Sequence, residues 1–407
     1  MADEIVDITI TNNNDTVTLD LAPNLITINV TNLVGLYEPA YEIEQARSQS
    51  IIKVPSSKLL DDSLSSLEAL INTDFLTNIF VGTDAGLNNT PLSSTQGRQN
   101  TFLGMSAGYY NTTGYAILNV GYASGYSNTT GTTNTNIGYQ AGFNNDTGSH
   151  NVNMGTDAGG GNLASDNMFI GFHTGGSVST PAITGTNNIF IGNESATVGG
   201  TMYNNTGIGY RNGFHITNGY NNALFGTFAG FALTTGYDNI FIGKDAGFSA
   251  TTATDSIYIG FRSGYYATSS YNQTAVGTFA LFNSTGNTNL AFGYSAGFSI
   301  TTGYNNTFIG YNAANNGSQK VDVHDSVVIG AQAYSAHNEA IVIGQGAFST
   351  KANQAVFGSG SITETILRGV LVCAGTPTYA DNAAAVAGGL AVNSHYKTAT
   401  GELRIVV

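Results

Sequence analysis

The chain has 407 residues, of which 52 are glycine and only 9% are charged, a composition unlike that of an average globular enzyme. Twelve basic and 26 acidic residues give a formal net charge of −14, which repels nucleic acid and anionic membranes and so argues against both as partners. Hydrophobic residues make up 41% of the chain, with 22 Tyr and 21 Phe, so the low charge does not indicate disorder.

The sequence carries few of the groups that hold cofactors or anchor a chain in a membrane. One cysteine, Cys373, excludes an intrachain disulfide framework, and the six histidines do not fall at metal-ligand spacing. Residues 1–5 lack the basic and apolar regions of a secretion signal, and no run of 18 apolar residues occurs. We therefore expect no cofactor, no bound metal, no export by a standard signal and no membrane insertion.

Residues 1–35 contain three short runs in which apolar and polar residues alternate. The runs are Ile5–Thr11, Thr16–Leu21 and Leu25–Val30, and turn-forming Asn, Asp and Pro residues separate them. Alternation with a period of two predicts a three-stranded β module. This module resembles the short β-rich attachment segments at the N-terminus of phage tail and collar fibres. The resemblance implies that it docks to other virion proteins.

Residues 36–77 are predicted to form a linker followed by a short helix. Four apolar residues recur there at spacings of 4, 3 and 4, which places them on one side of a helix over 57–75. They are Leu60, Leu64, Leu67 and Ile71. Two interpretations remain open: a helix lying across the base of the next domain, or a short three-stranded coiled coil.

Residues 78–360 are built from a repeated unit in which an apolar residue precedes a glycine. Most of these glycines are 17 residues apart, a spacing too constant to arise from glycine content alone, and the period shortens to 14 after Gly330. The repeated glycines are Gly82, Gly104, Gly121, Gly138, Gly155, Gly171, Gly192, Gly209, Gly226, Gly243, Gly260, Gly277, Gly293, Gly310, Gly330, Gly344 and Gly358.

Each unit has an internal pattern that predicts its local structure. The residue before each repeated glycine is large and apolar, from Val81 to Phe357, and we expect this column to point into the core. Ala-Gly often follows three and four residues later, as at Ala246-Gly247, which predicts a tight corner. Thr-Thr-Gly-Tyr, as at 234–237, supplies a return turn, so each unit is predicted to have two short strands and two turns.

The repeat predicts an all-β fold, a parallel β-solenoid or β-roll with 17-residue and then 14-residue coils. No unit contains an amphipathic pattern of helix length, which excludes leucine-rich, ankyrin and tetratricopeptide arrays, and the units are too short for propeller blades. With about 4.8 Å between stacked strands, the coils would form a rod on the order of 80 Å long. One coil cannot bury its apolar face alone, so the coils must stack.

The 14-residue units carry a more specific pattern. They read Val-Val-Ile-Gly-Ala-Gln-Ala-Tyr and then Ile-Val-Ile-Gly-Gln-Gly-Ala-Phe within residues 321–360. This stretch resembles the head repeats of trimeric autotransporter adhesins. The resemblance implies a left-handed parallel β-roll that associates as a homotrimer, and we extend that expectation to the longer coils.

Residues 361–407 are predicted to cap the solenoid. We expect a strand at Ile366–Val372 and a short helix between Asp381, near its N-terminus, and Gly388, just past its last turn. The ending from 389 onward resembles terminal segments of predicted phage tail-fibre and structural proteins. A cap would cover the strand edges that an open solenoid leaves unpaired.

The repeats offer little catalytic chemistry. Asp84, Asp157 and Asp245 recur at equivalent coil positions, which favours a sparse surface ladder over a polysaccharide-cleaving acid and base. No nucleophile elbow, phosphate-binding loop or zinc signature occurs. The chain is therefore not expected to be an enzyme, and no catalytic, cofactor-binding or metal-binding residue is assigned.

Other side chains have structural interpretations. His173, His215 and His324 are expected to face solvent or to hydrogen-bond locally, and Cys373 to be a small buried hydrophobe. The tyrosines that follow repeated glycines favour stacking on one another over carbohydrate binding. They are Tyr122, Tyr139, Tyr210, Tyr294 and Tyr311. The residues that would bind a receptor are not identified by the sequence.

These features favour a structural virion fibre. In this interpretation a homotrimer, assembled in the host cytoplasm, attaches to the virion by its N-terminus and projects a β-repeat shaft that adheres to a glycan or protein of the host surface. Three alternatives remain. A cellular trimeric adhesin predicts a secretion signal and a membrane anchor, a single-chain glycan- or ice-binding solenoid predicts a flat threonine ladder, and a fibre-borne depolymerase predicts more charge.

Overall fold

The computed structural model describes residues 8–12, 15–22, 25–30, 78–90, 96–176, 182–315, 322–364, 366, 377–390, 395–399 and 403–405. By its internal contacts the chain divides into two compact units, Met1–Ser359 and Gly360–Val407. The helix expected within 57–75, the strand expected at 366–372 apart from Ile366, and Cys373 lie outside the described residues.

Three strands near the N-terminus form an antiparallel sheet. They are β1 (Ile8–Asn12), β2 (Asp15–Ala22) and β3 (Leu25–Val30). The central strand β2 pairs with both neighbours, with Ile8 opposite Leu19 and Val17 opposite Val30. The three strands correspond to the three alternating runs of the sequence.

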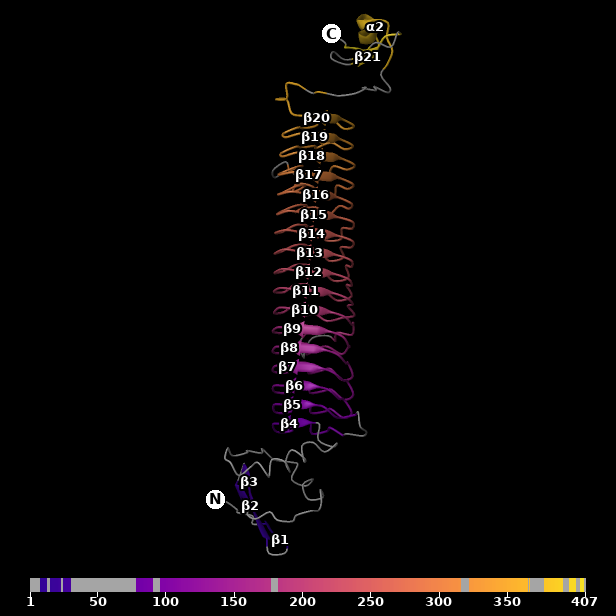
Figure 1. Cartoon of the computed structure of the whole chain (residues 1–407). Coiled ribbons are helices and arrows are strands. Elements are labelled where there is room, and N and C mark those ends of the chain that lie inside the picture. Colours follow the sequence, from indigo (N-terminus) through magenta and orange to yellow (C-terminus); the bar gives the residue numbers. More distant parts are fainter. Residues whose placement is uncertain are drawn as a thin grey trace. The chain divides into compact units, whose positions relative to one another are not determined.

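The repeats fold into a parallel β-solenoid in which every coil contributes one strand of three residues (Figure 1). The strands are β4 (Ile79–Val81), β5 (Thr101–Leu103), β6 (Leu118–Val120), β7 (Thr135–Ile137), β8 (Val152–Met154), β9 (Met168–Ile170), β10 (Ile189–Ile191), β11 (Thr206–Ile208), β12 (Ala223–Phe225), β13 (Ile240–Ile242), β14 (Ile257–Ile259), β15 (Thr274–Val276), β16 (Leu290–Phe292), β17 (Thr307–Ile309), β18 (Val327–Ile329), β19 (Ile341–Ile343) and β20 (Ala355–Phe357).

The strands pair in sequence order and in exact coil register. For example, Ile240, Phe241 and Ile242 lie beside Ile257, Tyr258 and Ile259 of the next coil. Among the described residues β4 pairs only with β5, and β20 only with β19, so the ladder is open at both ends. The stacked coils form a straight column (Figure 1), as the constant glycine spacing predicts.

The column before the repeated glycines was expected in the core, and this expectation is wrong. In a strand, residues one position apart point to opposite faces, so only the middle residue of each three-residue strand can point inward. That middle residue is buried in every coil from β5 to β19, as Phe102, Phe241 and Tyr258 illustrate. The residues before the glycines point outward instead, and Phe292 is 56% exposed.

The second strand expected in each coil is also absent from the described residues, which show only isolated parallel bridges there. The bridges connect Tyr203, Tyr220, Tyr237, Thr254 and Tyr271 in succession. A residue with positive φ follows each of these five positions, as at Asn204 (φ 53°), and one left-handed residue ends an extended segment. The return side of the coil is therefore a series of turns.

The repeated glycines are required by the backbone. Gly243 has φ +134°, and a Cβ atom at this position would lie 2.6 Å from the carbonyl oxygen of Gly260 in the next coil. Neither the dihedral angle nor the close approach suits a residue with a side chain. Adjacent coils can stack at strand spacing only because glycine occupies this column.

The interior changes character along the solenoid. From Phe169 to Ala347 it is a continuous hydrophobic cluster, and a smaller cluster surrounds Phe102. Between them, the middle residues of β6, β7 and β8 are asparagines, and the Nδ2 atoms of Asn136 and Asn153 each donate at 2.8 Å to the Oδ1 of the preceding one. Asparagine therefore fills the core of these coils.

The C-terminal unit contains α2 (Asn382–Ala387) and an antiparallel pair, β21 (His395–Lys397) and β22 (Leu403–Ile405). Asp381 is the N-cap, as predicted, and accepts a hydrogen bond from the Ala384 amide at 2.8 Å. Gly388 is the C-cap residue, with φ −78°, and Gly389 has the positive φ, +86°, of the position after it. The sequence analysis placed Gly388 just past the last turn of the helix, one residue before Gly389, which occupies that position in the structure.

Candidate functional site

The acidic residues predicted to form a surface ladder occupy one column within the turn that follows each strand, two residues after the repeated glycine. Asp84, Asp157 and Asp245 all have positive φ, between 54° and 58°, a conformation that Asp tolerates better than most residues. Asp157 contacts His173 at 2.9 Å and Asp245 contacts Arg262 at 3.1 Å. Asp157 and Asp245 each contact a side chain of the next coil, and the three acids are not brought together as an acid and base pair.

The sequence analysis did not identify the arginines that pair with acidic residues, although their spacing in the sequence could have shown them. Arg211 contacts Glu194 at 2.5 Å, and the two residues are separated by one 17-residue period, as are Arg262 and Asp245. Their guanidinium groups also lie over aromatic rings, with Arg262 5.0 Å from the Phe261 centroid. Comparing residues one period apart would have predicted these pairs.

The described residues hold no group of three or more His, Cys, Asp or Glu side chains that could bind a metal ion. Among the same residues, no helix has the length and apolar character needed to cross a bilayer.

The three histidines occupy different local environments. His173 and His324 hydrogen-bond to Asp157 and Asp325, at 2.9 and 2.8 Å, as predicted. His215 packs edge-on against Phe214 and Phe231, and burial lowers its pKa. None of the three joins a catalytic arrangement.

The tyrosines after the repeated glycines stack where they occupy adjacent coils. Tyr122 and Tyr139 stack with their centroids 5.2 Å apart, and Tyr294 and Tyr311 stack at 5.4 Å. Tyr210 instead meets Phe228 edge-on at 5.4 Å. This column therefore forms short stacks, in agreement with a packing role.

A longer aromatic stack lies on the wall of the coil opposite the strands. The inward side chain of each strand packs against the backbone of this wall. Tyr258 shows how closely: a Cβ atom added at Gly264 would lie 2.6 Å from the Tyr258 ring. The ring after each such glycine, and Phe282 after Leu281, stacks on the ring of the next coil, with centroids 5.0 to 5.3 Å apart. The members of this aromatic stack are Phe214, Phe231, Phe248, Tyr265, Phe282 and Phe298.

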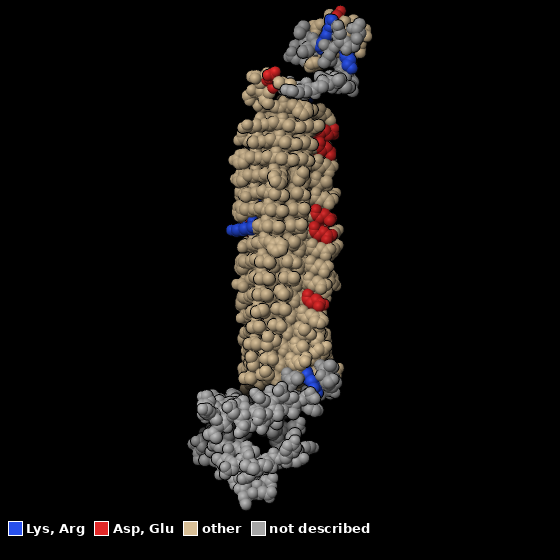
Figure 2. Space-filling view, in the orientation of Figure 1, with Lys and Arg blue, Asp and Glu red and all other residues tan. Residues whose placement is uncertain are grey.

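The outer face of the strand ladder is uncharged and largely apolar, with threonine at the first position of β5, β7, β11, β15 and β17. Its two outward columns are the first and third residues of each strand, and in β13 Ile240 and Ile242 are 39% and 38% exposed. Figure 2 shows that the visible surface of the solenoid carries few charged side chains, with acidic groups gathered at a few places along one edge. Exposed apolar surfaces of this extent are uncommon on single soluble chains.

A column of threonines lies beside the aromatic stack, and its regular hydrogen bonding fails at one coil. The hydroxyls of Thr234 and Thr251 donate to the carbonyl of the next threonine, at 2.9 and 2.8 Å. At Thr268 the backbone amide turns back to its own coil and donates to the Tyr266 carbonyl at 2.8 Å. Among the described residues, the Thr268 hydroxyl and the Thr285 carbonyl have no such partner.

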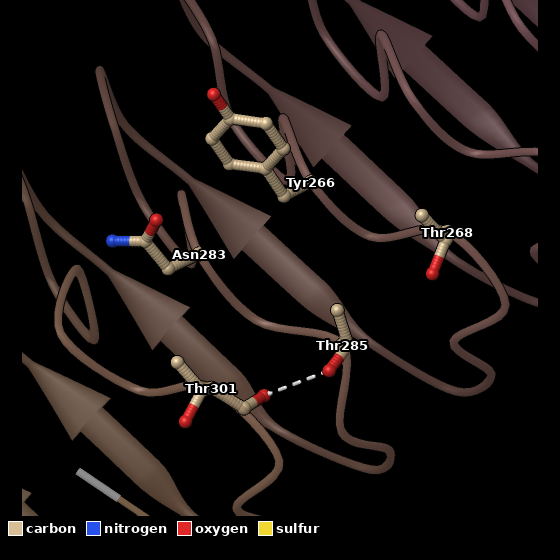
Figure 3. Close-up of a pocket in the computed structure, with 5 residues that line it drawn as sticks. All are labelled: Tyr266, Thr268, Asn283, Thr285 and Thr301. Atoms are coloured by element: carbon tan, nitrogen blue, oxygen red, sulfur yellow. Dashed lines mark hydrogen bonds between the residues drawn. The ribbon is translucent and has the colours of Figure 1, made fainter. Parts of the chain in front are cut away.

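A hollow of about 470 Å³ opens at this break, lined by Tyr266, Thr268, Asn283, Thr285 and Thr301. Figure 3 shows that these residues come from three successive coils and present their side chains to the same side. The coil between Gly277 and Gly293 has 16 residues where its neighbours have 17, and the missing residue falls in the turn after Thr285.

The side chains of the hollow are fixed in place by their neighbours. The Tyr266 ring stands edge-on to Tyr265 and Phe282, with centroid distances of 4.8 and 5.3 Å, and is 46% exposed. Asn283 donates its Nδ2 to the Phe298 carbonyl at 2.9 Å, which leaves its Oδ1 as a hydrogen-bond acceptor. An aromatic face and neutral hydrogen-bonding groups are the means by which proteins bind polar organic molecules.

No protein-family model matches this chain, and no curated protein matches it either.

Proposed function

We propose that the chain is the shaft-forming subunit of a homotrimeric virion fibre, attached through its N-terminal strands and used for adhesion to the host surface. The solenoid fold is compatible with this role. The number of subunits and the virion location come from the resemblance of residues 321–360 to trimeric adhesin heads and of the two ends of the chain to phage fibre proteins.

The observation that carries the proposal is the apolar outer face of β4 to β20. An aliphatic side chain that is two-fifths exposed leaves about 70 Å² uncovered, so the outward columns together exceed the roughly 800 Å² that one partner contributes to a standard interface. Their uncharged character is also what the centre of an interface needs.

The repeat of this face selects another copy as the partner. Apolar side chains recur once per coil over the whole solenoid, and a second stack with the same strand spacing meets them in register at every level. Copies related by a closed rotation all use the same face, so three chains can bury it around one axis. Shape and periodicity then support association over the full length.

The first test is the mass of the purified protein in solution, measured by light scattering beside circular dichroism. We expect three times the chain mass of 42.3 kDa and a β-rich spectrum. Replacing Ile240 and Ile242 together with lysine places charge in the interface and is expected to lower the mass toward one chain. Thr252→Lys, at an exposed position of the return turn, is the matched control and retains the trimer.

Immunoelectron microscopy with antibodies against the solenoid tests the virion role. Labelled projections on particles support the proposal. A trimer found only on cell surfaces would favour the cellular adhesin, and a β-rich single chain would favour the single-chain glycan- or ice-binding solenoid.

The ice-binding alternative receives little support from the threonine column. Thr234 and Thr251 donate their hydroxyl hydrogens to backbone carbonyls, and Tyr266 interrupts the small residues beside them. A flat, regular surface is therefore not maintained.

A further inference from the structure

We propose that the hollow lined by Tyr266, Thr268, Asn283, Thr285 and Thr301 binds a neutral saccharide unit of a surface glycan. This inference rests on the proposed adhesive function, for which it supplies the binding site. Its volume of about 470 Å³ lies within the range of small-molecule sites, about 300–1,000 Å³.

The Tyr266 ring provides the apolar surface of the site. A sugar ring has one face of C–H groups that can pack on an aromatic face, while its hydroxyls point sideways. Tyr265 and Phe282 hold the Tyr266 ring at 79° and 82° to their own planes, so its orientation is set before a ligand arrives. A fixed platform lowers the entropy lost on binding.

The groups around the ring complement sugar hydroxyls. The Thr268 hydroxyl can donate and accept, and the Asn283 Oδ1 and the Thr285 carbonyl can accept. In the regular coils the equivalent threonine groups bond to each other, so this set is available only where the ladder breaks. A sugar hydroxyl that bonds to both the Thr268 hydroxyl and the Thr285 carbonyl would replace the hydrogen bond that is missing between these two threonines.

The electrostatics favour a neutral ligand. None of the five lining residues is charged, and the carboxylate of Asp322 accepts a hydrogen bond from Thr301 at one end of the row. Thr301 and Thr302 hold the pKa of that carboxyl below its usual range, so it is ionised at neutral pH. An acidic sugar would meet this charge and the negative net charge of the chain.

The hollow stays accessible in the proposed trimer. Tyr266 lies two residues after Gly264. The side chain of Tyr258 in β14 points into the core and packs against the backbone of Gly264 on the opposite wall. The site therefore belongs to the wall opposite the outer face of the strands. Association through that face leaves one hollow per chain open, and three weak sites on one fibre bind a multivalent surface more tightly than one.

A matched control exists in the same chain. Tyr110 stands edge-on to Tyr109 and Tyr126, at 4.7 and 5.2 Å, and is 47% exposed. Beside it the ladder is intact, because the Thr112 hydroxyl donates to the Thr129 carbonyl at 2.9 Å. Tyr110 offers the same ring without the free polar groups.

The experiment titrates the full-length protein by calorimetry with oligosaccharides of glucose, galactose and mannose, and with sialylated and uronic-acid oligosaccharides as acidic probes. We expect at least one neutral series to bind and the acidic probes to bind more weakly. Tyr266→Ala should weaken binding by roughly fivefold or more and Thr268→Val by a similar factor, whereas Tyr110→Ala should leave it near wild type.

Light scattering on each variant separates the two proposals. A trimer that binds none of the neutral probes, or that loses binding equally with Tyr110→Ala and Tyr266→Ala, overturns the saccharide site and leaves the fibre proposal standing. A single chain that binds through Tyr266 supports the site and overturns the fibre proposal.

Discussion

The backbone amide and the side-chain amide of Asn239 both donate to the Oδ1 of Asn222 in the preceding coil, at 3.2 and 2.9 Å. Asn222 in turn donates its Nδ2 to the Asn205 Oδ1 and to the Gly236 carbonyl, both at 2.9 Å. One buried side chain thus satisfies backbone groups that the turn leaves without strand partners. The same arrangement repeats along much of the solenoid.

Asn222→Ala should therefore destabilise the solenoid. It leaves the buried Asn239 amide and Gly236 carbonyl without partners, at a cost of about 1–3 kcal/mol. Asn222→Ser should recover part of the loss, because Ser256 occupies this column naturally and accepts from the Gln273 amide. The measurement is the urea midpoint by circular dichroism, with exposed Thr235→Ala as control. Equal midpoints for the Asn222→Ala and Thr235→Ala variants would contradict the role of this ladder.

Comparing the repeated glycine Gly243 with Gly346, which lies outside that column, tests the close approach of the coils. Gly346→Ala meets nothing within 4 Å and has φ +62°, so it should cost only the left-handed conformation, about 1–2 kcal/mol. Gly243→Ala adds a clash of 2.6 Å with the Gly260 carbonyl oxygen and should cost several times more or prevent folding. Thermal unfolding of the two variants decides the matter, and equal losses would show that contact between coils is not the constraint.

The sequence was sufficient to predict the solenoid because its period is set by the backbone. Gly243 and its equivalents cannot be replaced, so their spacing is preserved and readable. The direction of the side chains was not readable, because apolar residues occupy both the outward positions, such as Ile242, and the inward ones, such as Phe241. Outward apolar residues are unusual in a single chain, which is why the core was assigned to the wrong column.

The saccharide-binding hollow could not be predicted from residue types alone. Tyr266 and Thr268 look like their counterparts Tyr110 and Thr112, and the difference lies in a hydrogen bond that only the folded ladder shows. One partial signal was available: the spacing from Gly277 to Gly293 is 16 residues and marks a shortened turn, although the spacing from Gly155 to Gly171 is also 16. A deletion in an otherwise regular repeat is a place to look for a site.

The buried phenol of Tyr258 should make stability depend on alkaline pH. Burial raises its pKa to about 12, and its hydroxyl donates to Gln273 Oε1 at 2.8 Å. The folded state keeps the proton while the unfolded chain loses it near pH 10, so the stabilising contribution is complete below pH 10 and disappears as pH rises to 12. The expected loss is about 2–3 kcal/mol over that range.

Tyr258→Phe removes this titration and keeps the ring, which matches Phe241 in the preceding coil. The difference in urea midpoint between wild type and variant should change between pH 10 and 12, with the wild type falling more steeply. The other tyrosines titrate in both proteins and cancel in the comparison. Parallel pH profiles for the two proteins would argue that the Tyr258 proton is not held by burial.

The cap of α2 can be tested within the C-terminal unit. Asp381 accepts a hydrogen bond from the Ala384 amide, so Asp381→Ala should cost the helix about 1 kcal/mol and speed amide exchange over 382–387 about fivefold. Asp381→Asn keeps an acceptor in the same position and should exchange almost like wild type. Hydrogen exchange followed by mass spectrometry gives both rates on the full chain. If the asparagine variant exchanges as fast as the alanine one, the carboxylate charge at the helix N-terminus, and not the side-chain acceptor, stabilises this helix.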